Sequence, residues 1–233
     1  MTRGHAASDR APVVLSLPFE GRWLARNSPA RRVPSHGVDL LGERYAIDFV
    51  GVDERGRPAR RRDWRTAFAT EPPERFVGFA RPILAPADGE VVVVHDGEPD
   101  HEARRSQLAL VPYALGQASR LRRGVGAIAG NHVVLATGDP PVYVALVHLQ
   151  AGSLAVRVGE RVVTGQPLAR CGSSGNSTQP HVHVQVMDDV DLAVARGVPL
   201  AFRDFLERRR GSRDVVLRRD GVPAEDAVVE PSP

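Results

Sequence analysis

Lysine is absent from this 233-residue sequence, and cysteine occurs only once, at Cys171. With a single cysteine, the chain cannot form an internal disulfide or a zinc site of four thiolates. Any bound metal must therefore be held by histidine, aspartate or glutamate. All 31 basic residues are arginine, and 28 acidic residues reduce the net charge to +3, so charge alone identifies no anionic partner.

Aromatic residues are also scarce, at 5% of the chain. The arginine clusters at 60–62 and 208–210 have no aromatic residues interleaved with them, so we interpret them as solvated surface and expect no nucleic-acid partner. No segment reaches the roughly 18 apolar residues of a membrane span, and residues 1–10 lack the apolar core of an export signal. The sequence therefore predicts no membrane span.

Short apolar or alternating runs, separated by Gly, Pro and Asp, dominate the chain, and its 42% hydrophobic content suffices for a core. This pattern predicts a mainly β protein. Few windows have a helical period; residues 203–210 and 106–121 are candidates for short helices. The expected strands are Tyr45–Val50, Val91–His95, Asn131–Ala136, Val142–Leu149, Leu154–Val158, Arg161–Val163 and His181–Met187.

Two long intervals, about 51–78 and 97–130, interrupt the strands. They are predicted to be insertions over one end of the sheet, where binding loops tend to lie. We expect residues 1–18 to be a mobile N-terminal segment and residues 211–233, which are polar and end in proline, to be a weakly packed tail. The domain between them spans 19–210.

The segment Gln-Pro-His-Val-His-Val-Gln-Val at 179–186 is the most informative part of the sequence. Successive side chains of a strand point to opposite faces, so His181, His183 and Gln185 should share one face. Buried imidazole nitrogens need partners, and a metal ion or a reacting proton supplies them. Taken alone, the histidine pair is equally compatible with a structural role.

Other segments offer residues that could complete such a site. Asp48 lies within the apolar run 45–50, where an unpaired carboxylate costs several kcal/mol to bury unless a cation lies opposite. His148 stands near the end of the apolar run 142–149, where a lone histidine is more often structural. The small-residue loop 169–180 leads into the histidine pair and leaves room for a peptide.

The order of these motifs resembles that of the lysostaphin-type zinc endopeptidases. The resemblance covers about residues 33–187, the expected core of the domain, and the motifs are specific in combination. In chain order they are His36, Tyr-Ala-Ile-Asp48, Pro-Ile-Leu-Ala-Pro-Ala-Asp-Gly-Glu-Val91, Gly-Asn-His-Val-Val134, Ala-Leu-Val-His-Leu149, Val-Gly-Glu-Arg-Val162, Gly-Gln-Pro-Leu168, Gly-Ser-Ser-Gly-Asn-Ser177 and Pro-His-Val-His183.

The resemblance implies an antiparallel β-sheet or barrel-sandwich of the duplicated-hybrid-motif type, with long loop insertions and few short helices. It also implies a zinc metalloendopeptidase that hydrolyses peptidoglycan cross-bridges or stem peptides. His36, Asp48 and His183 would hold Zn²⁺, and His148 and His181 would be the catalytic histidines, with the general base unassigned between them. Three such ligands leave a fourth position for water, as in catalytic zinc sites.

Several alternatives stay open. The family's common motif places the histidine four residues before the aspartate, but here Ser35 occupies that position relative to Asp39. His36 with Asp39 is the second candidate pair. A non-catalytic binding or regulatory module on the same fold is the alternative function. A lipoyl- or biotinyl-type carrier shares the hairpin at 158–162, but it needs a lysine and is excluded. The oligomeric state is unknown, and the location is cytoplasmic as the sequence stands but extracellular or cell-wall by the resemblance.

Overall fold

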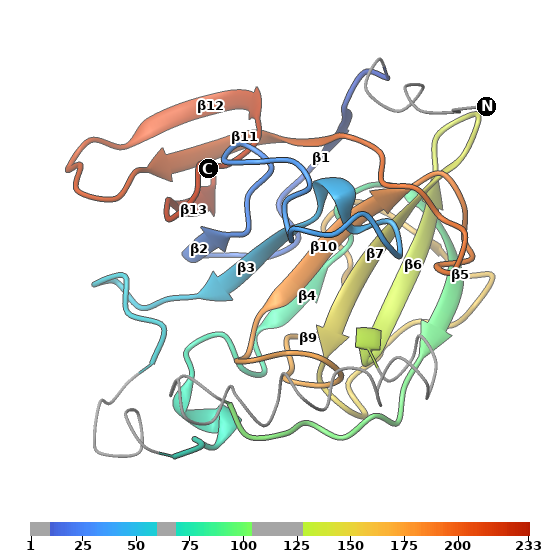
Figure 1. Cartoon of the computed structure of the whole chain (residues 1–233), viewed down its shortest axis with the longest axis horizontal. Coiled ribbons are helices and arrows are strands. Elements are labelled where there is room, and N and C mark those ends of the chain that lie inside the picture. Colours follow the sequence, from blue (N-terminus) through green and yellow to red (C-terminus); the bar gives the residue numbers. More distant parts are fainter. Residues whose placement is uncertain (1–9, 60–68, 104–127) are drawn as a thin grey trace.

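The computed structural model describes residues 10–59, 69–103 and 128–233, and these residues fold into strands with few helical turns (Figure 1). Glu43–Tyr45 (η1) and Pro73–Arg75 (η2) are short 3-10 turns. The strands are β1 (Val13–Leu15), β2 (Trp23–Arg26), β3 (Ile47–Gly51), β4 (Pro82–Leu84), β5 (Gly89–His95), β6 (Asn131–Thr137), β7 (Val142–Leu149), β8 (Arg161–Val162), β9 (Pro167–Arg170), β10 (Val182–Met187), β11 (Leu200–Arg208), β12 (Val216–Gly221) and β13 (Val228–Pro231).

Most of these strands belong to one large sheet. Its order is β1-β11-β13-β2-β3-β10-β7-β6-β5-β8, with β12 paired to β11, while β4 and β9 form a separate two-stranded sheet. The described pairs are antiparallel, except that β1 runs parallel to β11. The predicted mainly β fold with few short helices is therefore confirmed.

The principal hydrophobic core lies on one face of the large sheet and includes side chains of the small β4–β9 sheet, such as Ile83 and Leu168. Strand β10 contributes Val182, Val184 and Val186 to this core. Because side chains alternate along a strand, the intervening His183 projects from the opposite face, as the sequence predicts. Packing of these valines in the core therefore determines that His183 lies on the opposite face of the sheet.

Two local expectations were wrong. Residues 154–158 form no strand, and residues 203–210, expected to be helical, belong largely to β11. In β11, Phe202 and Phe205 are buried in the core while the backbone pairs with β12 and β13, so sheet pairing overrides the local helical pattern. The other predicted helix, 106–121, lies outside the described residues.

The chain ends are more firmly packed than the sequence suggests. The predicted weakly packed tail, 211–233, instead supplies β12 and β13, and β13 bridges β11 to β2 with Val229 fully buried. At the other end, β1 pairs with β11 and buries Leu15, so this part of the predicted mobile segment is ordered in the sheet. In the described part of the chain, no helix has the length and apolar character needed to cross a membrane.

Candidate metal centre

Asp48 and His183 face each other across neighbouring strands. Strands β3 and β10 are antiparallel, and their register places Asp48 directly opposite His183. His183 Nδ1 lies 2.9 Å from Asp48 Oδ1, and both side chains are buried. The apolar residues on either side of each position enter the core, so the sheet itself holds these two polar groups together.

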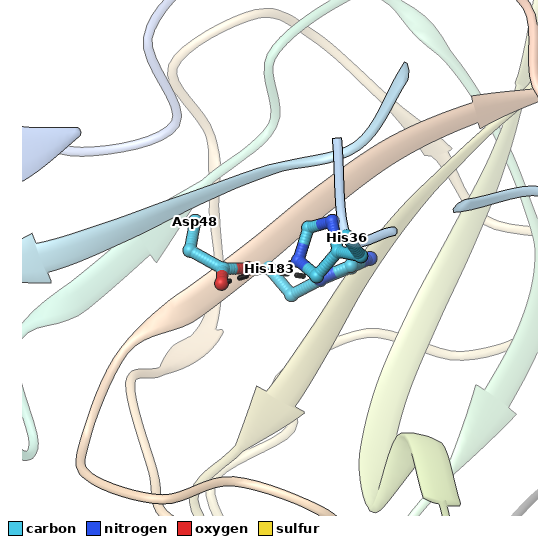
Figure 2. Close-up of side chains that lie close together, drawn as sticks. All are labelled: His36, Asp48 and His183. Atoms are coloured by element: carbon cyan, nitrogen blue, oxygen red, sulfur yellow. Dashed lines mark hydrogen bonds and ion pairs between the residues drawn. The ribbon is translucent and has the colours of Figure 1, made fainter. Parts of the chain in front are cut away.

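His36 reaches the same carboxylate from a loop. The loop folds back on itself because the Ser35 backbone N–H donates to the Arg44 carbonyl over 3.0 Å, and the Ser35 hydroxyl donates to the Glu43 carbonyl. His36 Nε2 then lies 3.2 Å from Asp48 Oδ2. The three side chains point toward one another, and one ligand-type atom from each lies within 4.8 Å of the others (Figure 2).

The carboxylate of Asp48 is held in its charged form. Burial alone would raise its pKa, but the nearby His181 and the hydrogen bonds from His183 and His36 hold the pKa well below its ordinary value. Asn27 Nδ2 also donates to Asp48 Oδ2 over 2.7 Å. Conversely, burial would lower the pKa of His183, but Asp48 outweighs it and raises this pKa to about 9.

This donor set fits a zinc ion. Two imidazole nitrogens and one carboxylate oxygen are ligands that zinc prefers, and bonds of about 2.0–2.1 Å place tetrahedral ligands about 3.3 Å apart. His183 Nδ1 lies 2.9 Å from one Asp48 oxygen and His36 Nε2 lies 3.2 Å from the other, so both imidazoles lie close enough to this carboxylate to share an ion with it.

His148 joins the site through an irregularity in β7. Between the pairs Asn131–Leu149 and Val133–Leu146, β6 advances two residues while β7 advances three, so β7 contains one extra residue. His148 has a left-handed backbone conformation there, with φ of 65°. Strict alternation would have directed its side chain into the core with Leu146. The bulge turns it instead to the face occupied by His183.

His148 and His181 are both oriented by backbone carbonyls. His148 Nδ1 lies 3.0 Å from the Ser174 carbonyl, and His181 Nδ1 lies 2.8 Å from the Gln179 carbonyl. Since a carbonyl only accepts, each Nδ1 carries a proton, and each Nε2 is an acceptor when the ring is neutral. Burial is the main cause of the lowered pKa of both rings, and the lowering is larger for His148. The two ring centroids are 4.7 Å apart.

The five side chains open into one cavity of about 300 Å³. Its wall combines polar groups with a smaller number of apolar ones. The lining residues are Asn27, His36, Val38, Leu41, Glu43, Asp48, Ile128, Ala129, Val147, His148, Asn176, Thr178, His181, His183, Gln185 and Leu192. The structure therefore brings together all five predicted site residues, His36, Asp48, His148, His181 and His183.

Other candidates lie elsewhere. Asp39 forms an ion pair with Arg44 at the surface, with half of its side chain exposed, and does not join the three-residue group. His95 and His132 stack on each other across β5 and β6 and do not line the cavity. Cys171 is fully buried, and burial raises the pKa of its thiol, which is consistent with the predicted packing role.

Several residues that support the site were not predicted from the sequence. Asn27 lies beside Asp48 because the preceding residue, Arg26, pairs with Asp48 in the β2–β3 register. Ser174 and Ser177 belong to the small-residue loop, which was expected to leave room for a peptide but also supplies partners for His148 and His181. Only the strand register and loop path reveal these contacts.

Comparisons with known proteins match part of this chain. Residues 113–195 match the model of peptidase family M23, and this segment includes His148, His181 and His183. This match agrees with the resemblance predicted from the motifs over residues 113–195. No curated protein sequence matches the chain.

Several solved structures are similar to this chain at low identity. The catalytic domain of lysostaphin from Staphylococcus simulans is 17% identical, with 76% of this chain and 88% of that chain covered and a TM-score of 0.39. The catalytic domain of an A109H mutant of the prophage-encoded M23 protein EnpA from Enterococcus faecalis is also 17% identical, with coverages of 83% and 93% and a TM-score of 0.39. A zinc-containing peptidase from Vibrio cholerae is 20% identical, with coverages of 66% and 45% and a TM-score of 0.33.

Proposed function

We propose that this protein is a zinc-dependent metalloendopeptidase whose metal ligands are His36, Asp48 and His183. The observation that supports this most is the convergence of two imidazole nitrogens on one buried carboxylate, in a cavity that contains two further histidines. A structural zinc site is normally closed by four protein ligands, whereas three ligands in an open cavity leave a position for water. The M23 family match supports a peptidase role.

The protein residues supply the positions and the protons for hydrolysis. Bound zinc would activate a water molecule and polarise the scissile carbonyl. His148 and His181 both present Nε2 to the cavity, and their lowered pKa values keep them neutral near pH 7, so either can accept a proton at Nε2. The protonated ring then becomes a donor, able to stabilise a developing oxyanion or to protonate the leaving amine.

The proposed substrates are short peptides of peptidoglycan, either cross-bridges or stem peptides. This choice rests on the resemblance of the motifs and on the similarity to lysostaphin, which is described as an antimicrobial peptidase. Among the described residues that line the cavity, Asp48 and Glu43 are the carboxylates and none is an arginine, which agrees with a neutral peptide.

Metal analysis combined with a hydrolysis assay tests the proposal. The purified chain should bind one equivalent of zinc, lose hydrolysis of cross-bridge or stem peptides on chelation, and regain it when zinc is restored. His183→Ala should abolish zinc retention, whereas His95→Ala, a histidine outside the cavity, should leave it unchanged. Full zinc occupancy in His183→Ala would refute the ligand assignment. Stoichiometric zinc without hydrolysis of any peptide would favour the non-catalytic binding module.

A further inference from the structure

Gln185 occupies a buried position between His183 and the loop that bears His36. It lies two residues after His183 on β10, projects from the same face, and is only 3% exposed. Its carboxamide contacts His183 on one side and the loop that bears His36 on the other. Burying a polar amide is unfavourable unless its hydrogen bonds are satisfied, so both contacts help to stabilise the buried side chain.

The loop contact fixes the orientation of the carboxamide. Gln185 Nε2 donates to the backbone carbonyl of Leu41 over 2.8 Å. Because that carbonyl can only accept, the amide nitrogen must face it, and Gln185 Oε1 must face His183 Nε2, 2.9 Å away. An amide oxygen likewise only accepts. His183 Nε2 therefore carries the proton, which leaves Nδ1 as the coordinating nitrogen, on the side of Asp48.

The loop is seated closely on β10 at this point. Leu41 and Gly42 both have left-handed backbone conformations, with φ of 54° and 76°. A Cβ at position 42 would lie 2.7 Å from Met187 Cγ and 3.2 Å from Gln185 Nε2. Only glycine allows this approach, so the contact between Gln185 and Leu41 is built into the path of the loop that presents His36.

We infer that Gln185 is a positioning residue that sets the tautomer of His183 and ties it to the His36 loop. This inference rests on the proposed function, because it assumes that His183 binds the metal through Nδ1. Gln185 acts through His183 and the loop, because its carboxamide oxygen and nitrogen are bonded to them. Groups that hold the second nitrogen of a metal-binding histidine fix its ring orientation and raise its basicity, and their loss typically lowers metal affinity 10- to 100-fold.

The test compares zinc affinity in three variants, measured by competition with a chromophoric chelator. Gln185→Met keeps a side chain of similar length but removes the hydrogen bonds to His183 and Leu41. Zinc affinity should fall about 10- to 100-fold. Gln185→Glu keeps an acceptor for His183 Nε2–H but cannot donate to Leu41, so zinc affinity should stay near the wild-type value while thermal stability falls. Gln166→Met is the matched control: its carboxamide bonds to Glu160 in a distant hairpin, and zinc affinity should not change.

A spectroscopic measurement separates positioning from general destabilisation. In the zinc-loaded wild type, the His183 Nε2–H should give a protected imidazole N–H resonance, which Gln185→Glu should retain and Gln185→Met should lose. The inference is overturned if Gln185→Met binds zinc as tightly as the wild type, or if Gln185→Glu loses affinity as severely. Absence of hydrolysis by a wild type that binds zinc would remove the proposed function alone, while a wild type that binds no zinc would overturn both.

Discussion

Replacing Asp48 with asparagine removes one negative charge from the buried site while nearly preserving the shape of the side chain. In the metal-free protein, Asp48 is the main reason that the pKa of His183 is raised to about 9, since burial acts in the opposite direction. In Asp48→Asn, burial is left without this opposition, and the pKa of His183 should fall below its ordinary value of 6.5.

This change has a defined effect on stability. A group whose pKa is raised by folding stabilises the native state fully below its unfolded pKa, and that contribution is lost as pH rises through the folded pKa. For His183, the window runs from about 6.5 to about 9, and each pKa unit is worth about 1.4 kcal/mol. The metal-free wild type should therefore lose about 3 kcal/mol of unfolding free energy across this window. Asp48→Asn should show no such loss.

Urea denaturation of the chelated proteins between pH 6 and pH 10 measures this difference, and NMR titration of His183 gives its pKa directly. Asp53→Asn is the control, because Asp53 also accepts hydrogen bonds but lies at the surface beside Arg57, away from the histidines. The unfolding free energy of Asp53→Asn should depend on pH between 6 and 10 in the same way as that of the wild type. Asp48 would not hold the proton on His183 if the unfolding free energy of the wild type did not depend on pH in this range. The same would follow if the unfolding free energy of Asp48→Asn changed with pH as steeply as that of the wild type.

Three further predictions concern the metal, the proton acceptor and the loop. Zinc at about 100 times its dissociation constant should stabilise the protein by about 2.7 kcal/mol, and a thermal shift that chelator does not reverse would contradict this. His148→Ala should keep zinc affinity but reduce the catalytic rate about 100-fold, measured with saturating peptide, and an unchanged rate would remove His148 from catalysis. Gly42→Ala should lower the melting temperature more than Gly152→Ala, because both positions have positive φ but only a Cβ at Gly42 meets other atoms. Equal shifts in the two variants would show that the loop has room at Gly42.

The part of the site on β10 follows directly from the sequence. Alternation of valine with polar residues predicts that His183 and Gln185 share a face opposite the core, and the structure agrees. The burial of Asp48 in an apolar run likewise predicts a cationic partner, which the register of β3 and β10 supplies as His183. These predictions succeeded because each depends on residues close together in one strand.

Predictions that depend on distant pairing were less successful. The segment 203–210 has a local helical pattern, but β12 and β13 offer its backbone partners on both sides, and Phe205 is buried by joining the sheet. The C-terminal segment reads as polar because β12 is largely exposed, although β13 lies within the sheet. Neither pairing can be seen within one strand's own sequence: β12 and β13 follow β11 in the chain, and β2, the second partner of β13, lies near the N-terminus.

The orientation of His148 could not be predicted from the sequence. Counting residues along 142–149 places His148 on the core face with Val144 and Leu146, where a histidine would be buried without a partner. One extra residue in β7 reverses this outcome, at the cost of a left-handed conformation worth about 1–3 kcal/mol. The Ser174 carbonyl, which binds His148 Nδ1, helps to offset that cost. A strained residue persists when the surrounding structure determines its conformation. The bulge in β7 is best explained by what it achieves, which is to bring the ring centroid of His148 to 4.7 Å from that of His181.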